Sequence, residues 1–486
     1  MSGSATRPLA PPRTGKVGGA ALAVVGRLPA WAWILGAWAA ASLPKLAVRS
    51  FRWEEGNYAV MARDMLARGD LLEPAIFGLR WAEKPALLAW LIAGVARLTG
   101  AVDEWSARLV PMLAILATAL VVERFTRRYA GAPAALFAAM AFMFCPMLLR
   151  KIRIAEPDTI ITLLSFAALV VWWTGEERGR VSLGRWLACG GLLATLAMAK
   201  GPQPVGFFAM GVGGYLLMQR RWAALPGFML CLAIPAAATA AWALAVYRGD
   251  QDLSVWATYL RVHDLRFNVR HYVRERVRFG VGLPIDLLPS TLLVPAAIRA
   301  WWRTPRDDAS PSPVLPLAAY AGVCTLALLV WPGTKTRYAM PIAPAVAVMA
   351  GLAFAPLFRR RHWLAITALA ATIGLFVYQV VLVTLVIPHN MPKYSAPRRR
   401  APVLDAAIAA SPAPVFTIGK AQSNKLFYLT HPILSVGPED PALKAPAWVF
   451  ASRKQLVRLQ ALRPELDIRE VMPAMNGAGL VLARIE

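Results

Sequence analysis

The sequence predicts an all-α polytopic membrane protein, with about 11–13 transmembrane helices followed by a small α/β domain. Two observations predict this class. Of the 486 residues, 58% are hydrophobic and only 16% are charged, whereas about 25% of the residues in a soluble globular chain are charged. The apolar residues also form long runs, most of which approach the roughly 20 residues that a helix needs to cross a bilayer. The composition therefore excludes a water-soluble enzyme and an intrinsically disordered chain.

About eleven apolar runs are candidates for membrane spans. They cover residues 29–48, 106–122, 131–149, 158–174, 183–199, 202–218, 223–246, 282–300, 313–331, 338–357 and 363–387. The run 85–99 has only about 15 residues and contains Arg97. If it does not cross the membrane, the arginine clusters between the spans all fall on the cytoplasmic side, as the positive-inside rule requires. These clusters are Arg124, Arg127 and Arg128; Arg178, Arg180 and Arg185; Arg220 and Arg221; Arg303 and Arg306; and Arg359, Arg360 and Arg361. We therefore expect 85–99 to form an amphipathic helix at the membrane surface.

The same alternation assigns a side of the membrane to the other segments. Residues 1–28 are expected to form a cytoplasmic tail, and residues 29–387 the transmembrane domain. Two loops of that domain, 49–105 and 247–281, are expected on the outer side. In residues 388–486 the charges are mixed, and strand-like runs alternate with helix-like ones, which predicts a small α/β domain on the outer side. The strand-like runs are Val415–Gly419, Trp448–Ala451 and Leu480–Arg484.

The net charge and the positions of the cysteines indicate which partners and metal sites to expect. The net charge of +26 would suggest a nucleic-acid partner in a soluble protein. Here the basic residues lie between apolar runs, so we expect them to set the topology and to contact anionic lipids or phosphates, with no nucleic acid bound. The cysteines lie inside apolar runs without metal-ligand spacing, which predicts buried thiols and neither a zinc site nor a disulfide framework.

Charged residues near a bilayer are costly and usually functional. In the predicted topology they gather on the outer side from separate parts of the chain. The candidates are Glu54 and Glu55; Glu83 and Lys84; Arg153, Glu156 and Asp158; Lys200; and Lys335 and Arg337, with Tyr338 beside them. A carboxylate can deprotonate an acceptor hydroxyl, and lysine and arginine can stabilise a departing phosphate. The pattern favours a general base that faces a phosphate-bearing substrate.

Each of these residues also has a purely structural explanation. A charge beside a membrane helix often marks only the end of that helix, and Lys200 or Lys335 could snorkel to the interface. Arg153 could do no more than pair with Glu156. His263 lies in a basic loop, where a histidine is more typical of a surface residue than of a ligand, and the arginines of that loop could form a lipid-surface patch.

A resemblance to a known family is carried by four segments in chain order. They are EEGNYAVMARDMLARGDLLEPAIFGLRWAEKPALLAWLIAG, RIAEPDTIITLL, AKGPQPVGFF and GTKTRYAMPIAPAVAVMAG. Together they resemble the bacterial membrane glycosyltransferases of the GT-C fold. The similarity is greatest to the aminoarabinose-transferase-like branch, which is related to the protein O-mannosyltransferases, and it covers roughly residues 30–360.

The resemblance implies roles for particular residues. It assigns Glu54, with Glu55 beside it, to the reaction centre, and it matches Asp158 to the acidic residue that opens the fourth helix. The candidate substrate or phosphate contacts are Tyr58, Glu83, Lys84, Arg153, Lys200, Lys335, Arg337, Tyr338 and His263. Two positions depart from the family pattern, because the family usually has aspartate where this chain has Glu54 and often has arginine where it has Asn57.

The function implied is that of a multi-pass glycosyltransferase of a bacterial inner membrane. It would move a sugar from a polyprenyl-phosphate donor to a periplasm-facing acceptor, an anionic lipid such as a lipid A-type glycolipid or another envelope glycan. The N-terminus would be cytoplasmic, and the site and the C-terminal domain periplasmic. No cofactor is expected, although Glu54 and Asp158 could share a divalent metal. The alternatives are a non-catalytic lipid-linked sugar transporter or flippase, which usually has broken helices at the midplane, and a scaffold of an envelope assembly complex.

Overall fold

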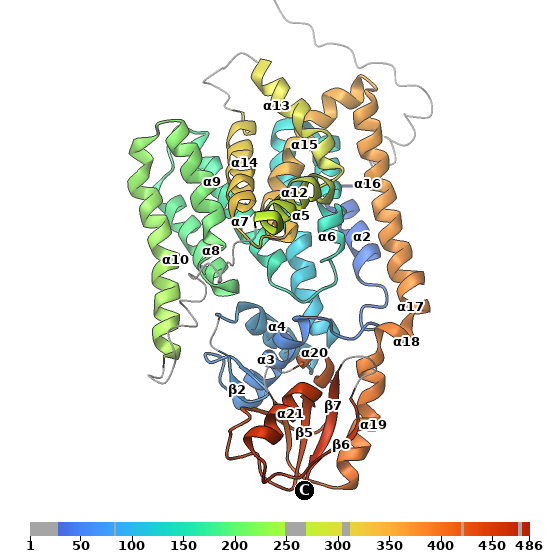
Figure 1. Ribbon diagram of the computed structural model, residues 1–486. Helices are drawn as coiled ribbons and strands as arrows, with labels where there is room; N and C mark the ends of the chain where they lie inside the picture. The colour runs from blue at the N-terminus through green and yellow to red at the C-terminus, as the bar shows by residue number, and fades with distance from the viewer. Residues whose placement is uncertain (1–27, 82–83, 248–268, 304–311, 419–421, 475–478) are drawn as a thin grey trace, which may run out of the picture.

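The computed structural model describes residues 28–81, 84–247, 269–303, 312–418, 422–474 and 479–486. A bundle of helices forms one end of the molecule, and a domain with a β-sheet forms the other (Figure 1). Helices α3 and α4 lie between the two. The chain is therefore an all-α polytopic protein with a small C-terminal α/β domain, as predicted.

The bundle contains most of the helices. They are α2 (Ala30–Ser42), α5 (Glu104–Met143), α6 (Pro146–Leu149), α7 (Asp158–Glu176), α8 (Leu183–Lys200), α9 (Val205–Met218), α10 (Leu225–Val246), α12 (Val269–Asp286), α13 (Val294–Arg303), α14 (Val314–Val330), α15 (Ala343–Arg359) and α16 (Trp363–Val381). Among the described residues, five helical stretches are long and apolar enough to cross a membrane. Three further apolar helices are shorter, and every predicted span overlaps at least one of the bundle helices.

Helix α5 shows how two predicted spans join. The sequence predicts separate spans at 106–122 and 131–149, and the structure has one helical stretch with a break at Gly131, where φ is 79° and ψ is 177°. Glycine adopts a positive φ without the steric cost that a Cβ atom brings. Beyond the break, α5 packs tightly on α15, because a Cβ at Gly351 would lie 2.8 Å from the Cβ of Ala138.

The predicted span at 282–300 corresponds to a bent pair of helices. The helical stretches Val269–Asp286 and Ser290–Arg303 meet there at an angle of 95°. Pro289 lies in the break and has no backbone N–H with which to continue a helix. Helix α12 also covers residues 269–281, the last part of the predicted loop 247–281, whereas residues 248–268 lie outside the described residues.

The first predicted loop is folded rather than extended. It contains α3 (Glu55–Arg68), the hairpin β1 (Ala75–Ile76) and β2 (Leu79–Arg80), and α4 (Leu87–Thr99). The 13 residues of α4 span only about 20 Å. Ile92 of α4 and Met65 of α3 share a buried apolar cluster with Leu426 and Phe450 of the C-terminal domain. This packing agrees with the prediction that 85–99 does not cross the membrane.

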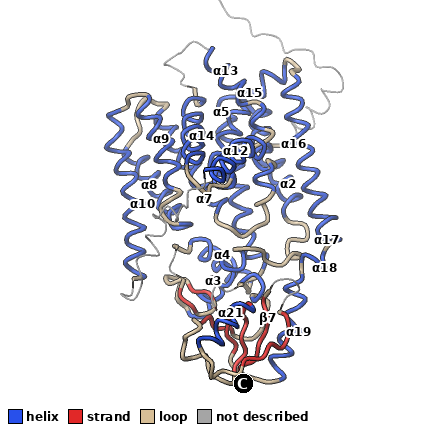
Figure 2. The backbone as a smooth tube through the Cα atoms, in the orientation of Figure 1, coloured by secondary structure: helices blue, strands red, loops and turns tan. Residues whose placement is uncertain are grey.

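The C-terminal domain holds a five-stranded sheet in the order β4-β3-β5-β7-β6. Its strands are β3 (Val415–Ile418), β4 (Ile433–Val436), β5 (Ala447–Ser452), β6 (Ile468–Pro473) and β7 (Leu480–Ile485), and its helices are α19 (Ala396–Ala410), α20 (Ser423–Leu426) and α21 (Arg453–Leu462). Strand β3 runs parallel to β4 and β5, while β7 is antiparallel to β5 and β6. Figure 2 shows that the strands are confined to this end of the molecule. The three predicted strands correspond to β3, β5 and β7; β4 and β6 were not predicted.

Candidate active site

Two groups of acidic and basic side chains lie where the bundle meets α3. The first, here called the Glu55 cluster, consists of Glu55, Arg49, Arg108 and Arg153. The second, here called the Asp158 cluster, is larger and contains Glu54, Lys151, Glu156, Asp158, Lys200, Arg337 and Tyr338. The adjacent residues Glu54 and Glu55 thus belong to different clusters.

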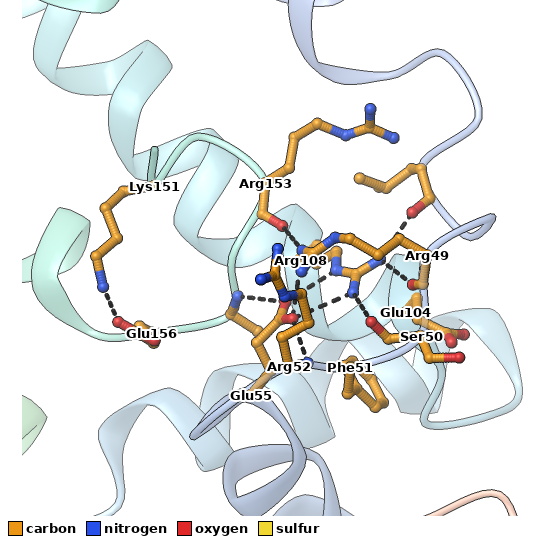
Figure 3. Close-up of polar contacts among 12 residues, drawn as sticks. Arg49, Ser50, Phe51, Arg52, Glu55, Glu104, Arg108, Lys151, Arg153 and Glu156 are labelled. Atoms are coloured by element: carbon orange, nitrogen blue, oxygen red, sulfur yellow. Dashed lines mark hydrogen bonds and ion pairs between the residues drawn. The ribbon is translucent and has the colours of Figure 1, made fainter. Parts of the chain in front are cut away.

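Glu55 is fully buried and surrounded by donors (Figure 3). The Nε and Nη2 atoms of Arg108 lie 2.9 and 3.2 Å from its two carboxylate oxygens, and Nη2 of Arg49 lies 3.3 Å away. The backbone N–H groups of Ala155 and Arg52 donate to the same carboxylate at 3.0 and 2.8 Å. These donors occupy the acceptor sites that a carboxylate offers. Glu55 therefore joins the start of α3 to α5 and to the 150–157 loop.

The charges of the Glu55 cluster shift each other's pKa values. Burial alone would raise the pKa of Glu55, but the guanidinium groups of Arg108 and Arg49 hold it below its usual value. Burial, together with the charge of Arg108, lowers the pKa of Arg49 to about 10 and that of Arg153 to about 9. Glu55 is therefore held in its ionised form, and the cluster keeps an excess of positive charge.

Asp158 is the first residue of α7 and lies between two lysines. Its Oδ1 is 3.1 Å from Nζ of Lys200, and its Oδ2 is 3.3 Å from Nζ of Lys151. Lys151 also forms a close ion pair with Glu156. Lys200 ends α8, and Gly201 follows with a φ of 88°, which lets the chain turn away directly after the lysine. Two helix ends thus bring Asp158 and Lys200 together.

Tyr338 lies between two cations of the Asp158 cluster. Nζ of Lys200 is 5.6 Å from the centre of the tyrosine ring, and the guanidinium carbon of Arg337 is 5.3 Å from it. Both distances permit cation–π attraction. The Nε atom of Arg337 is buried and has no hydrogen-bond acceptor among the described residues. An anion entering this cluster would supply that acceptor.

Glu54 precedes α3 and is exposed. Its carboxylate forms no ion pair or hydrogen bond with any other residue that the structure describes. Its charge nevertheless reaches Lys200 and Glu156. Burial raises the pKa of Glu156; Lys151 opposes this shift, and Asp158 and Glu54 add to it. The Asp158 cluster therefore contains one exposed carboxylate with free acceptor sites.

The other predicted site residues are placed elsewhere. Arg153 lies in the Glu55 cluster, where its Nη2 donates to the carbonyl of Pro44 at 2.9 Å. Figure 3 shows Arg153 and Lys151 pointing to different sides of their loop. Tyr58 is buried in the apolar cluster of α3, Lys84 is half-buried and Lys335 is exposed. Glu83 and His263 lie outside the described residues.

Sequence reasoning missed Arg108, Arg49 and Lys151. Arg108 had a usable signal, because it lies inside the predicted span 106–122, where a charge needs a partner. Lys151 precedes the chosen acidic residues and had no distinguishing signal of its own. No group of three or more His, Cys, Asp or Glu side chains that could hold a metal occurs among the described residues.

Sequence comparisons relate the chain to membrane glycosyltransferases. Residues 83–244 match the family described as dolichyl-phosphate-mannose-protein mannosyltransferase. Curated relatives called undecaprenyl phosphate-alpha-4-amino-4-deoxy-L-arabinose arabinosyl transferase occur in Edwardsiella ictaluri, with 28% identity, and in Pseudomonas aeruginosa, with 27%. Each alignment covers 61% of this chain and 54% of the relative. The chain thus spans about half the length of the curated relatives it matches.

Solved structures extend the likeness to nearly the whole chain. ArnT from Cupriavidus metallidurans bound to undecaprenyl phosphate has a TM-score of 0.66 and 18% identity, covering 96% of this chain and 98% of that one. The Archaeoglobus fulgidus oligosaccharyltransferase in complex with Zn and sulfate has a TM-score of 0.52 and 11% identity, covering 92% and 72%. The chain therefore has the GT-C glycosyltransferase fold and is related in sequence to the aminoarabinose-transferase-like branch of that group.

Proposed function

We propose that this protein is a glycosyltransferase that moves a sugar from a polyprenyl-phosphate donor to an acceptor at the end of the bundle that carries α3. The observation that carries the proposal is the Asp158 cluster. It combines an exposed carboxylate with free acceptor sites, the lysine–aspartate pair of Lys200 and Asp158, and a buried arginine donor without an acceptor in the described part of the chain. The names of the curated relatives support undecaprenyl phosphate as the donor lipid.

In the proposed reaction, Glu54 is the general base. An acceptor oxygen attacks the anomeric carbon of the sugar while the bond from that carbon to the phosphate oxygen breaks. The phosphate leaves with the bonding electrons, and the acceptor proton passes to the Glu54 carboxylate. An exposed carboxylate that accepts from none of the described side chains suits this role better than Glu55, whose oxygens already accept hydrogen bonds. We therefore assign Glu55 a structural role.

The cations of the cluster would stabilise the departing phosphate. Lys200 and Arg337 flank Tyr338 and present positive charge to one region. Charge-assisted hydrogen bonds to phosphate are among the strongest in proteins. Leaving the Arg337 donor unsatisfied costs on the order of 1–3 kcal/mol, which a bound phosphate would recover. Asp158 pairs with both neighbouring lysines, so we assign it the positioning of Lys200.

The location follows from the same proposal. A polyprenyl-phosphate donor and an envelope acceptor imply a bacterial inner membrane, with the Asp158 cluster and the C-terminal domain on the periplasmic side. Glu54 directly precedes α3, which lies between the bundle and the C-terminal domain (Figure 1), and this supports a single reaction compartment. A phosphate leaving group is already good, so positioning and charge can supply most of the rate without a cofactor. We propose an anionic lipid or a glycan of the envelope as the acceptor.

A lipid-linked sugar flippase is the second candidate. The bend of 95° between α12 and α13 favours it, because transporters often bind substrate at broken helices. The charged residues of the Asp158 cluster instead gather at one end of the bundle, which favours an enzyme. The two candidates differ in the fate of the donor, which an enzyme consumes and a flippase only moves between leaflets.

The experiment follows the donor by mass spectrometry. Purified protein in liposomes is given a panel of undecaprenyl-phosphate sugars together with extracted envelope lipids. The wild type should deplete one donor and form a glycosylated lipid. Lys200→Met should lower the rate on the order of 10²-fold, whereas Lys393→Met, at an exposed lysine of the short helix Met391–Tyr394, should not. A wild type that neither binds nor consumes any donor overturns the proposal, and movement without consumption supports the flippase.

A further inference from the structure

One side of helix α12 is hydrogen-bonded to the C-terminal end of α14. Nη1 of Arg276 donates to the carbonyls of Leu328 and Leu329, each at 3.1 Å, and to Oγ1 of Thr334 at 2.6 Å. The hydroxyl of Tyr272 donates to the carbonyl of Val330 at 2.8 Å. These bonds satisfy carbonyls that the last turn of α14 leaves without an intrahelical partner. The middle of α12 is therefore fixed to the segment that leads into Arg337 and Tyr338.

The C-terminal end of α12 contacts a second segment of the Asp158 cluster, the loop that carries Lys151. Oδ2 of Asp286 lies 2.7 Å from Nη2 of Arg150, the residue before Lys151. At Gly282 a Cβ would lie 3.2 Å from the Thr336 methyl group, so the helix also touches the residue before Arg337. Two of the segments that bring residues to the cluster, 150–158 and 334–338, thus contact α12.

The opposite side of α12 is covered by nothing that the structure describes. An apolar residue occurs there at every fourth position, and each is at least half exposed: Val269 59%, Val273 50%, Val277 60%, Val281 60% and Ile285 53%. Residues four apart are offset by only about 40° around a helix, so these five side chains form a stripe that winds slowly along its outward side. The inward face is different, because Phe279 and Leu283 are buried against the bundle.

A second stripe, of arginines, runs beside the apolar one. Arg270, Arg274 and Arg278 each follow a valine of the first stripe, and all three are exposed. None of the three forms an ion pair or hydrogen bond with another described residue. The one acidic residue between them, Glu275, is turned away and pairs with His271 and Arg276. The outward face of α12 is therefore half apolar and half cationic, without a carboxylate to neutralise it.

We propose that the outward face of α12 lies in the headgroup layer of the bilayer and that Arg270, Arg274 and Arg278 bind anionic phospholipid headgroups. An apolar stripe beside a basic stripe is the pattern of helices that lie in the membrane interface. Three unpaired guanidinium groups are complementary to lipid phosphates, and basic residues near the bilayer are attracted to anionic lipids. Because the inward face contacts two segments of the Asp158 cluster, 150–158 and 334–338, headgroup binding also fixes the distance of these segments from the membrane. This inference does not depend on the proposed reaction.

The test measures which lipid touches α12. The native cysteines at 145, 189, 231 and 324 are all buried, so Val277→Cys can be labelled selectively with a bimane fluorophore. The labelled protein is placed in phosphatidylcholine nanodiscs that contain an equal mole fraction of either brominated phosphatidylglycerol or brominated phosphatidylcholine. We expect stronger quenching by the brominated phosphatidylglycerol.

Two matched variants decide the role of the arginines. Changing Arg270, Arg274 and Arg278 to glutamine should abolish the preference for phosphatidylglycerol while quenching by phosphatidylcholine persists. The same change at Arg359, Arg360 and Arg361, which are exposed at the end of α15, should leave the preference intact. Equal quenching by both lipids in the wild type overturns the anionic-lipid site, and no quenching by either lipid overturns the interfacial position of α12.

Discussion

The Glu55 and Asp158 clusters are built from the same residue types and lie at the same end of the bundle, but they differ in what their groups have left to bind. Glu55 has no exposed surface, and every side of its carboxylate meets a donor. In the Asp158 cluster the Lys200 side chain is 27% exposed, and among the described residues Glu54 has no donor and Nε of Arg337 has no acceptor. Free hydrogen-bonding capacity, rather than charge, distinguishes a group that can meet a substrate from one that holds segments together.

The Glu55 cluster also connects to the C-terminal domain. Tyr428 donates from its hydroxyl to Glu104 at 2.6 Å, and the backbone N–H of Phe51 donates to the same hydroxyl at 2.7 Å. Arg398 forms a close ion pair with Glu104. Since Glu104 begins α5, which carries Arg108, the bundle, the start of α3 and the C-terminal domain meet around one buried network. The residue next to it, Glu54, is held in place by this network without being part of it.

The largest expected effect is at Glu54. Glu54→Gln keeps the size of the side chain and removes its ability to accept a proton. We expect the rate of sugar transfer to fall on the order of 10²–10⁴-fold, with the thermal unfolding midpoint unchanged because no protein contact is lost. The measurement is the initial rate of product formation at saturating donor. Glu439→Gln, at an exposed glutamate of the C-terminal domain, is the matched control and should retain the wild-type rate.

The second effect should appear in folding. Glu55→Gln or Arg108→Met removes one partner of a buried ion pair, and such changes cost about 3–5 kcal/mol because the remaining charge is left unpaired. We expect a lower unfolding temperature in detergent for each variant, with a smaller loss in the double variant than the sum of the two. A Glu55→Gln protein that unfolds like the wild type but has lost transfer activity would reverse the roles of the two glutamates.

A smaller effect is expected where α3 meets the C-terminal domain. A Cβ at Gly56 would lie 2.2 Å from the backbone nitrogen of Asn424, so Gly56→Ala must move one of the two segments. Overpacking of this kind costs about 1–3 kcal/mol. Because Gly56 follows Glu55, we also expect the misplaced Glu54 to lower kcat more than it raises KM for the donor.

The control for Gly56→Ala is Gly36→Ala in α2, where a Cβ would meet nothing within 4 Å. Alanine is favoured over glycine inside a helix by roughly 0.5–1 kcal/mol, so this variant should be unchanged or slightly more stable. If Gly56→Ala behaves like Gly36→Ala in both stability and rate, the contact with Asn424 does not position α3.

The sequence allowed the class of protein and much of the site to be predicted. Apolar run length predicted the bundle, and the alternation of arginine clusters predicted that 85–99 is not a span. The short segments around Asp158, Lys200 and Arg337 were expected near one another, and the structure brings them together. Their proximity could be predicted from the sequence because each segment lies at the end of an apolar run.

The sequence could not predict that Glu54 and Glu55 have different surroundings, for a geometric reason. Successive residues of a helix point about 100° apart, so two adjacent glutamates face different surroundings, and the direction of each depends on how α3 is rotated. That rotation is fixed by Arg108 and Ala155, which are distant in the sequence. Arg153 is placed away from the Asp158 cluster because its side chain and that of Lys151 leave the 150–157 loop on different sides (Figure 3).

The smallest expected effect that distinguishes the Glu55 and Asp158 clusters is on the pH dependence of stability, because the two clusters shift glutamate pKa values in opposite directions. Burial raises the pKa of Glu156 above the ordinary value of 4.5, so the folded protein loses stability as the pH rises through that higher pKa. The guanidinium groups around Glu55 outweigh its burial and hold its pKa below 4.5, so its contribution is present above that pH and is lost as the pH falls through the lower pKa. As the pH rises above 4.5, the unfolding temperature should therefore fall less in Glu156→Gln than in the wild type, and as the pH falls below 4.5 it should fall less steeply in Glu55→Gln. Parallel curves for the wild type and Glu156→Gln would show that Glu156 titrates as an exposed glutamate does, and the Asp158 cluster would then be more open to water than its burial implies.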